Sequence, residues 1–134
     1  MLTTILVKDY MSSRLVTLTP ETDVFEAIRK LLENRITGAP VIDEEGNLVG
    51  MFSEKGCMKV VLEASYNQGM GGKVSEFMTH TSETIDGEAS IVDAAEKFLN
   101  SDMRNIPVFE DVDLVGIISR TDVLRALSSH QLFI

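Results

Sequence analysis

The chain repeats itself, and this internal repeat constrains its fold more than any other feature of its 134 residues. Three segments of the first half recur in the second half in the same order and at nearly the same spacing. They are Val7–Met11 with Val74–Met78, Pro40–Val41 with Pro107–Val108, and Leu48–Gly50 with Leu114–Gly116. A repeat of this kind indicates that one structural unit is present twice. We therefore predict one copy in residues 1–65 and a second in residues 74–134, joined by a glycine-rich connection over residues 66–73.

Each copy has the pattern strand, helix, strand, strand, helix. The first helix of each copy is indicated by apolar side chains at helical spacing and by an N-cap residue, Asp23 or Ser90, with an acidic residue three positions later. The other predicted elements are strands over 15–18, 39–43 and 48–52 and closing helices near 55–65 and 120–129. One copy alone buries too little apolar surface to be comfortably stable. We predict an α+β fold in which two β-α-β-β-α repeats pack sheet to sheet with pseudo-two-fold symmetry.

The charge of the chain excludes several classes of partner. With 21 acidic and 12 basic residues, the formal net charge is −9. Residues 7–61 carry seven bases and nine acids, a net −2, whereas residues 74–127 carry four bases and eleven acids, a net −7. Binding to a nucleic-acid backbone or to an anionic membrane surface needs a basic face, so we expect neither partner.

Cysteine and histidine usage points to a cytoplasmic protein without catalytic machinery. Cys57 is the only cysteine, which excludes an intrachain disulfide and indicates a reducing compartment. The N-terminal sequence has no signal-peptide pattern, and no apolar run reaches the roughly 18 residues of a spanning helix. His80 and His130 lie far apart without metal ligands at the usual spacing, and no nucleophile–base pair is indicated. We therefore expect no metal site and no enzyme activity.

Several short segments match one known family in their order and in their duplication. They are Ala39–Asp43 and Ile106–Phe109 in the strands, Gly50–Gly56 and Gly116–Asp122 in the closing segments, and the Val-x-x-aromatic-Met opening of each copy. With these segments the whole chain resembles a tandem pair of CBS domains, or Bateman module, named after cystathionine beta-synthase. The resemblance implies a regulatory module with no obligatory cofactor. Its ligand would be an adenine nucleotide (AMP, ADP or ATP) or S-adenosylmethionine, bound in the cleft between the repeats.

The family's ribose–phosphate signature is intact in the second copy as Gly116, Ser119, Thr121 and Asp122. The resemblance implies that Asp122 accepts hydrogen bonds from two ribose hydroxyls, while the neighbouring hydroxyls and the helix N-terminus bind phosphate. The same Ser-x-x-Asp spacing also fits a helix N-capping box that needs no ligand. Both roles can coexist on one side chain.

The resemblance completes this site with the first strand of the first copy and its helix-to-strand loop. The strand would contact adenine through its backbone, Ile36 and Pro40 would form apolar walls, and Gly38 would permit close approach. Core packing is the alternative for both walls, and a solvated side chain is the alternative for Arg120. The predicted ligand-binding residues are Leu15, Val16, Thr17, Ile36, Thr37, Gly38, Pro40, Ser119, Arg120, Thr121 and Asp122.

The equivalent site of the first copy lacks its carboxylate. Gly56 stands at the position of Asp122, and Lys55 stands at the position of Thr121. Ribose recognition should weaken there, although Lys55 and Arg104 could still attract phosphate. We predict a second site that is weak or empty, formed by Ser53, Lys55, Thr84, Met103, Arg104, Asn105 and Pro107.

The resemblance also implies protein partners. We expect a homodimer that forms a four-domain disc and, because the sequence contains no effector domain, regulation of an unidentified effector protein in trans. Candidate dimer surfaces are the helix face with Val24, Ile28 and Leu31, the closing helices, and the apolar tail Leu132–Ile134, for which a core contact is equally open. The alternative function is a constitutive interaction or dimerisation module without a physiological ligand. The scarcity of basic residues near the site favours a monophosphate or a neutral adenosyl ligand over a polyphosphate.

Overall fold

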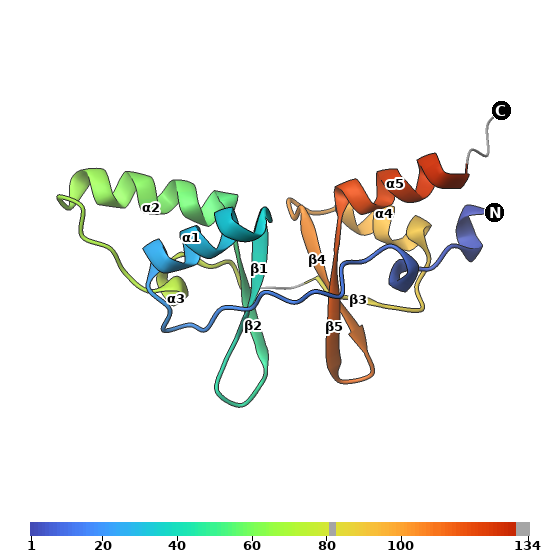
Figure 1. Cartoon of the computed structure of the whole chain (residues 1–134), viewed down its shortest axis with the longest axis horizontal. Helices are drawn as coiled ribbons and strands as arrows, with labels where there is room; N and C mark the ends of the chain where they lie inside the picture. The colour runs from blue at the N-terminus through green and yellow to red at the C-terminus, as the bar shows by residue number, and fades with distance from the viewer. Residues whose placement is uncertain (81–82, 131–134) are drawn as a thin grey trace. The chain divides into compact units, whose positions relative to one another are not determined.

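The structure is a computed structural model that describes residues 1–80 and 83–130. Its helices and strands form two compact units, each with its own small sheet (Figure 1). The central unit is Val16–Ser82, and the terminal unit combines Met1–Leu15 with Glu83–Ile134. The mixture of short helices and largely antiparallel strands confirms the predicted α+β class.

The central unit is built on the antiparallel pair β1 (Gly38–Ile42) and β2 (Leu48–Ser53). Its helices are α1 (Val24–Asn34), α2 (Glu54–Tyr66) and the short α3 (Val74–Phe77). Helix α1 begins where predicted, because the Asp23 carboxylate accepts hydrogen bonds from the N–H groups of Phe25 and Glu26 at 3.0 and 3.2 Å. The buried core of the unit consists of Leu18, Val24, Ala27, Leu31, Ala39, Val41, Phe52, Val60 and Val74.

This core corrects one of the predicted dimer surfaces. Val24 is fully buried, Leu31 is 4% exposed, and Ile28 packs against the same cluster. The apolar stripe of α1 therefore faces the core of its own unit, as amphipathic helices of globular proteins usually do. The tail Leu132–Ile134, the other named candidate, lies outside the described residues.

The strand predicted over residues 15–18 is wrong in its extent. Leu18 alone pairs with β1: its N–H donates to Pro40 O at 2.9 Å, and its carbonyl accepts from Ile42 N–H at 2.8 Å. Residues 15–17 form no strand or bridge, and beyond Leu18 the chain reaches Pro20, which has no N–H with which to extend the pairing. The equivalent segment of the second copy is β3 (Ile85–Asp86), which is a strand of only two residues.

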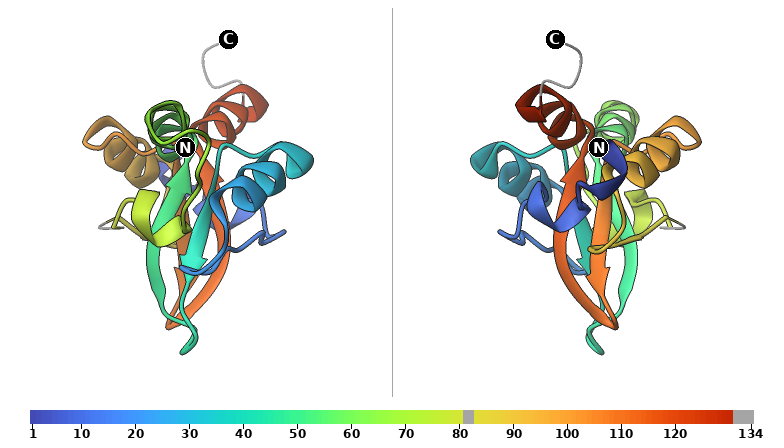
Figure 2. Two further views of the ribbon diagram at one scale, coloured as in Figure 1. Left: turned by 90° about the vertical axis from the view of Figure 1, so that its left-hand side faces the viewer. Right: turned by 90° about the vertical axis from the view of Figure 1, so that its right-hand side faces the viewer.

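The terminal unit contains a three-stranded sheet in the order β3-β4-β5. Strand β3 is parallel to β4 (Asn105–Glu110), which is antiparallel to β5 (Asp113–Ser119). Helices α4 (Ile91–Leu99) and α5 (Arg120–His130) contact each other. In the right-hand view of Figure 2 they lie on either side of the upper end of this sheet. Ser90 and Asp93 form the capping box predicted for α4, with both hydrogen bonds at 3.1 Å. The buried core consists of Ile5, Val7, Ile85, Ile91, Ala94, Phe98, Ile106, Val108, Ile118 and Ala126.

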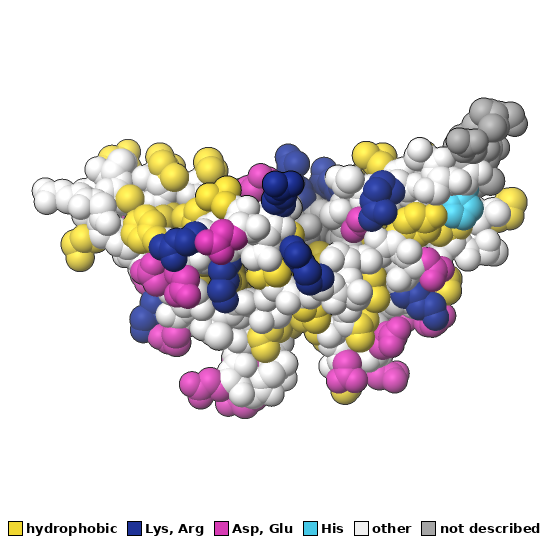
Figure 3. All heavy atoms as spheres, in the orientation of Figure 1, with side chains coloured by type: hydrophobic (Ala, Val, Ile, Leu, Met, Phe, Trp, Pro, Cys, Tyr) yellow, Lys and Arg dark blue, Asp and Glu magenta, His cyan; other side chains and the backbone are white. Residues whose placement is uncertain are grey.

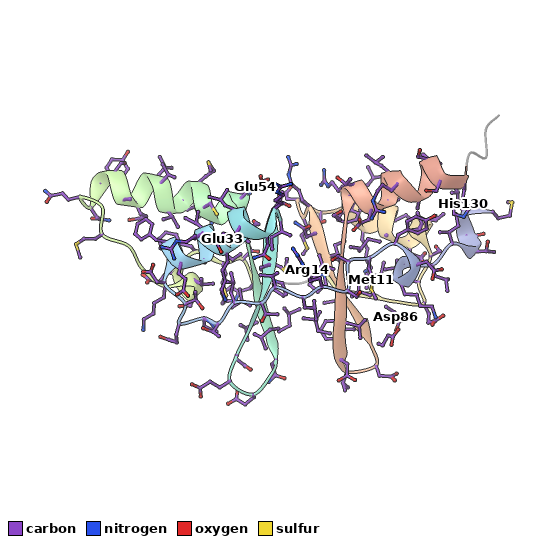
Figure 4. The ribbon with its side chains drawn as sticks, in the orientation of Figure 1. Met11, Arg14, Glu33, Glu54, Asp86 and His130 are labelled. Carbon is purple, nitrogen blue, oxygen red and sulfur yellow. The ribbon has the colours of Figure 1, made fainter. Side chains whose placement is uncertain are left out.

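The opening segments, residues 7–12 and 74–79, each pack on the strands of the other sequence copy. Ser12 exchanges two backbone hydrogen bonds with Ile117 of β5, at 2.9 and 3.0 Å, and Thr79 exchanges two with Met51 of β2, both at 2.9 Å. Met11 accordingly lies beside β5 (Figure 4). The compact units therefore divide the chain at different places from the sequence copies.

A glycine on each receiving strand permits this close approach. A Cβ atom on Gly116 would lie 2.7 Å from the carbonyl oxygen of Ser12, and a Cβ atom on Gly50 would lie 2.5 Å from that of Thr79. Any larger residue would have to displace the opening segment. The same close contact between an opening segment and a strand glycine therefore occurs once in each unit. It accounts for the glycine that both copies share at this position.

Candidate functional site

The start of α5 holds the residues of the intact signature. Strand β5 ends at Ser119 and α5 begins at Arg120, so the strand passes directly into the helix. The Arg120 N–H donates to the carbonyl of Arg104 at 3.2 Å. Ser119 Oγ accepts from the Asp122 N–H at 3.1 Å, and Asp122 Oδ2 accepts from the Ser119 N–H at 2.8 Å. The capping box is therefore formed, and the Asp122 side chain is 13% exposed.

The other oxygen of this carboxylate contacts Arg125. Arg125 Nη2 donates to Asp122 Oδ1 and lies 3.3 Å from the backbone carbonyl oxygen of Tyr10 in the opening segment. Because each carboxylate oxygen can accept two hydrogen bonds, each oxygen of Asp122 keeps one acceptor position beyond these described contacts. The structural role of Asp122 as a helix cap is therefore compatible with binding a ligand that carries two hydroxyl donors.

Arg120 is held by the loop between α4 and β4. Its Nε donates to the carbonyl of Met103 at 3.1 Å, and its Nη2 lies 3.4 Å from the carbonyl oxygens of Phe98 and Ser101. The guanidinium also lies 5.8 Å from the centre of the Phe98 ring. Arg120 therefore fixes this loop, and its predicted contact with a ligand stays a prediction. Thr121, beside it on the first turn of α5, is exposed.

The predicted base-binding residues, except Leu15, lie in the central unit. Ile36–Pro40 form the end of the α1–β1 loop and the start of β1, and the Thr37 carbonyl accepts from the Glu54 N–H at 3.0 Å. Thr17 and Thr37 are exposed, Ile36 and Val16 are half-buried, and Gly38 and Pro40 are buried. Leu15 is 36% exposed and ends the first part of the terminal unit. The structure thus brings each half of the predicted set together within its own unit.

The weaker predicted site is divided in the same way. Ser53 and Lys55 lie at the start of α2, whereas Thr84, Met103, Arg104, Asn105 and Pro107 belong to the terminal unit. Within the described part of the chain, Ser53 makes no side-chain capping bond to α2. A Cβ atom on Gly56 would lie 2.8 Å from the carbonyl oxygen of Phe77 and 3.2 Å from the Phe52 ring. The position of the missing carboxylate is therefore filled by packed backbone and an aromatic ring.

Comparison with known proteins identifies the family. The model of the CBS domain matches residues 7–63 and again residues 74–129. The chain belongs to the CBS domain family. The two matched segments are the two CBS repeats, and each carries one of the two opening segments.

Solved CBS-pair structures share this fold over nearly the whole chain. The crystal structure of CBSX2 from Arabidopsis thaliana in complex with AMP has 31% sequence identity and a TM-score of 0.80, and covers 95% of this chain and 98% of that chain. The CBS domain pair of MJ0100, in complex with 5′-methylthioadenosine and S-adenosyl-L-methionine, has 25% identity and a TM-score of 0.78, with 93% and 97% coverage.

Curated relatives are mostly longer than the matched region. Chloroplastic CBSX1 of Arabidopsis thaliana is 32% identical over 80% of this chain and 56% of its own length. MJ1225 of Methanocaldococcus jannaschii, an uncharacterised protein, is 25% identical over 95% of this chain. The chain spans 44% of MJ1225 and 14% of another relative, the A-adding tRNA nucleotidyltransferase of Aquifex aeolicus. CBS repeats therefore occur within several kinds of larger protein.

Sequence reasoning missed Arg125. The signal was present, because Arg125 follows Asp122 by three positions, a spacing that brings two side chains together on a helix. On α5, the predicted site included no residue beyond Asp122, where the family signature ends. Arg125 is the residue that the structure adds to the carboxylate.

Metal binding and thiol chemistry have no support in residues 1–80 and 83–130. No group of His, Cys, Asp and Glu side chains there is arranged to hold a metal ion. Burial, with the nearby Glu54 carboxylate as a second cause, raises the pKa of the Cys57 thiol, which keeps it protonated at neutral pH and a poor nucleophile. Over the same residues, no helix combines the length and the apolarity that crossing a membrane requires.

Proposed function

We propose that this chain is a regulatory CBS module whose ligand contains an adenosyl group. AMP, 5′-methylthioadenosine and S-adenosylmethionine, the ligands of two similar structures, share adenine and a ribose with adjacent 2′ and 3′ hydroxyls. The observation that carries the proposal is the Asp122 carboxylate, which is mostly buried yet keeps one acceptor position on each oxygen. Such a group matches a ribose diol, which presents two neighbouring donors.

Each part of the ligand has a proposed partner. Asp122 accepts from the two ribose hydroxyls, and each such charge-assisted hydrogen bond contributes about 1.5–3 kcal/mol. The hydroxyls of Ser119 and Thr121, helped by the positive end of the α5 helix dipole, bind a 5′ substituent that accepts hydrogen bonds. The adenine partners proposed from the family resemblance are Leu15, Val16, Thr17, Ile36, Thr37, Gly38 and Pro40. The second site of Ser53, Lys55 and their predicted partners is proposed to be weak or empty.

The ligands that test this proposal differ in the number of phosphate groups and in the base. We expect adenosine, 5′-methylthioadenosine and AMP to stabilise the protein more than ADP, and ADP more than ATP, because residues 74–127 carry a net −7. A ligand at 100 times its Kd should stabilise the fold by about 2.7 kcal/mol, which raises Tm by on the order of 10 °C. The measurement is thermal unfolding at constant ionic strength, with inosine as the control for the base. No shift with any adenosyl compound, or the largest shift with ATP, would contradict the proposal.

We propose further that the ligand-binding module regulates a separate effector protein in the cytoplasm. The alternative function is an interaction module that binds no physiological ligand. One observation favours an interaction role in either case. Helix α2 exposes an apolar stripe of Met58, Val61, Leu62 and Tyr66, which are between 58% and 80% exposed. Figure 3 shows exposed hydrophobic side chains over this helix. Exposed apolar patches of this kind mark interaction surfaces. We assign this stripe to a second copy of the chain.

Light scattering tests the proposed homodimer. The wild-type chain should have twice its 14.8 kDa monomer mass, and Leu62→Lys should shift the mass toward the monomer by burying a charge in the interface. Val112→Lys is the matched control, because Val112 is 88% exposed on the β4–β5 turn. A monomeric wild-type chain, or a Leu62→Lys chain that remains dimeric, would contradict the assignment of the α2 stripe.

A further inference from the structure

We propose that Arg125 is a positioning residue of the adenosyl site, which holds the Asp122 carboxylate in the orientation that a ribose diol requires. The inference rests on the proposed function and names a residue outside the family signature. The contact that carries it is the hydrogen bond from Arg125 Nη2 to Asp122 Oδ1, one helical turn along α5.

The two oxygens of Asp122 are held from different directions. Oδ2 accepts from the Ser119 N–H at 2.8 Å, at the end of β5, and Oδ1 accepts from Arg125 on the second turn of α5. With only the first bond, the carboxylate could rotate about its Cβ–Cγ bond, since that torsion is soft. With both bonds, its plane is fixed before any ligand arrives. Preorganised acceptors of this kind bind more tightly because less conformational freedom is lost on binding.

Arg125 is itself held by a second fixed group. The same Nη2 atom lies 3.3 Å from the Tyr10 carbonyl oxygen. Tyr10 is anchored independently, because its ring centre lies 6.1 Å from that of His130 and its neighbour Met11 donates an N–H to Val7 O at 2.9 Å. His130 lies near the end of α5 (Figure 4). The guanidinium therefore connects the opening segment to the carboxylate and cannot swing away without losing both contacts.

The exposure of Arg125 makes the inference testable. Its side chain is 58% exposed, so its replacement opens no core cavity, and an ion pair with one exposed partner contributes little to stability. A change in binding on substitution can therefore be separated from a loss of folding. The competing role for an exposed cation here is direct contact with a ligand phosphate.

Calorimetric titration with three probes separates these roles. Adenosine and 2′,3′-dideoxyadenosine differ only in the diol, and adenosine and AMP differ only in the phosphate. For the wild-type protein we expect adenosine to bind at least tenfold more tightly than the dideoxy compound. In Arg125→Ala this ratio should fall about three- to tenfold while the ratio of AMP to adenosine stays unchanged. Arg125→Lys should restore part of the diol ratio. Arg29→Ala, which removes the same charge from an exposed position on α1, should change neither ratio.

Each remaining outcome overturns the inference in a recognisable way. An unchanged diol ratio in Arg125→Ala means that Asp122 does not depend on Arg125. A reduced AMP-to-adenosine ratio with an unchanged diol ratio makes Arg125 a phosphate ligand instead. If the wild-type chain binds none of the three probes, the proposed function fails and this inference fails with it. If the wild-type chain binds adenosine but Arg125→Ala leaves the diol ratio unaltered, this inference alone fails.

Discussion

Asp122→Ala is expected to abolish the thermal stabilisation of the protein by adenosine or AMP while the chain still folds. The substitution removes both acceptors of the ribose diol, so the Kd for adenosine should rise on the order of 100-fold, which corresponds to about 2.7 kcal/mol. It also removes one half of the capping box at the start of α5. That loss should lower the free energy of unfolding by about 1 kcal/mol, because N-terminal caps contribute about that much. Titration calorimetry and thermal unfolding measure the two effects separately.

Helix α4 provides a matched control for this substitution. Asp93 occupies the same capping-box position relative to Ser90 as Asp122 does relative to Ser119, in the same unit. Asp93→Ala should therefore cost a similar amount of stability and leave the Kd for adenosine unchanged. If Asp122→Ala binds adenosine as tightly as the wild type, or if Asp93→Ala weakens binding equally, Asp122 is a structural cap and not a ribose acceptor.

Local sequence signals predicted α1, α2, α4, α5 and the paired strands well, although they did not predict the short α3. Capping residues marked the first residue of α1 and α4, and the turn after Asp43 separates β1 from β2 because the Asp43 carboxylate accepts from two N–H groups within the turn, those of Glu45 and Asn47. These features depend on residues within four positions of one another. They could therefore be recognised without knowing the tertiary structure.

The pairing of the opening segments could not be predicted in the same way. Ser12 pairs with Ile117 across more than one hundred positions, through backbone groups that carry no sequence information. The repeat therefore suggested a division at the connection, whereas the compact units exchange their opening segments. The extent of the strand near Leu18 was overestimated for a related reason. Apolar β-forming residues favour a strand over residues 15–18, but of these four only Leu18 bonds to β1, a tertiary contact that the sequence pattern does not contain.

The candidate site shows the same division between local and non-local information. Its signature at Asp122 was visible in the sequence, as was the capping box that it forms. The sequence also shows that position 56 carries no carboxylate, but it does not show why. Only the structure shows that the Phe77 carbonyl, from a helix 21 positions along the chain, occupies the space beside Gly56.

Gly56→Asp is therefore expected to destabilise the protein without creating a second ligand site. The new Cβ atom would lie 2.8 Å from the Phe77 carbonyl oxygen and 3.2 Å from the Phe52 ring, which is itself fully buried. Overpacking of this kind costs about 1–3 kcal/mol, and a buried carboxylate without a partner adds a further penalty. The free energy of unfolding should fall by about 3–5 kcal/mol. Denaturant unfolding measures this loss, and calorimetry should still give one adenosine bound per chain.

The smaller substitution separates the steric cause from the charge. Gly56→Ala keeps the clash with Phe77 but adds no carboxylate, so it should cost about 1–3 kcal/mol. Gly87→Ala is the control, because Gly87 is also buried but its Cβ position is 3.5 Å from its nearest neighbour, the Lys8 Cβ atom. An alanine with that much room should change stability by less than about 1 kcal/mol. Equal costs for the two alanine variants, or a Gly56→Asp chain that is stable and binds two adenosines, would mean that the first repeat lacks its carboxylate for a reason other than packing.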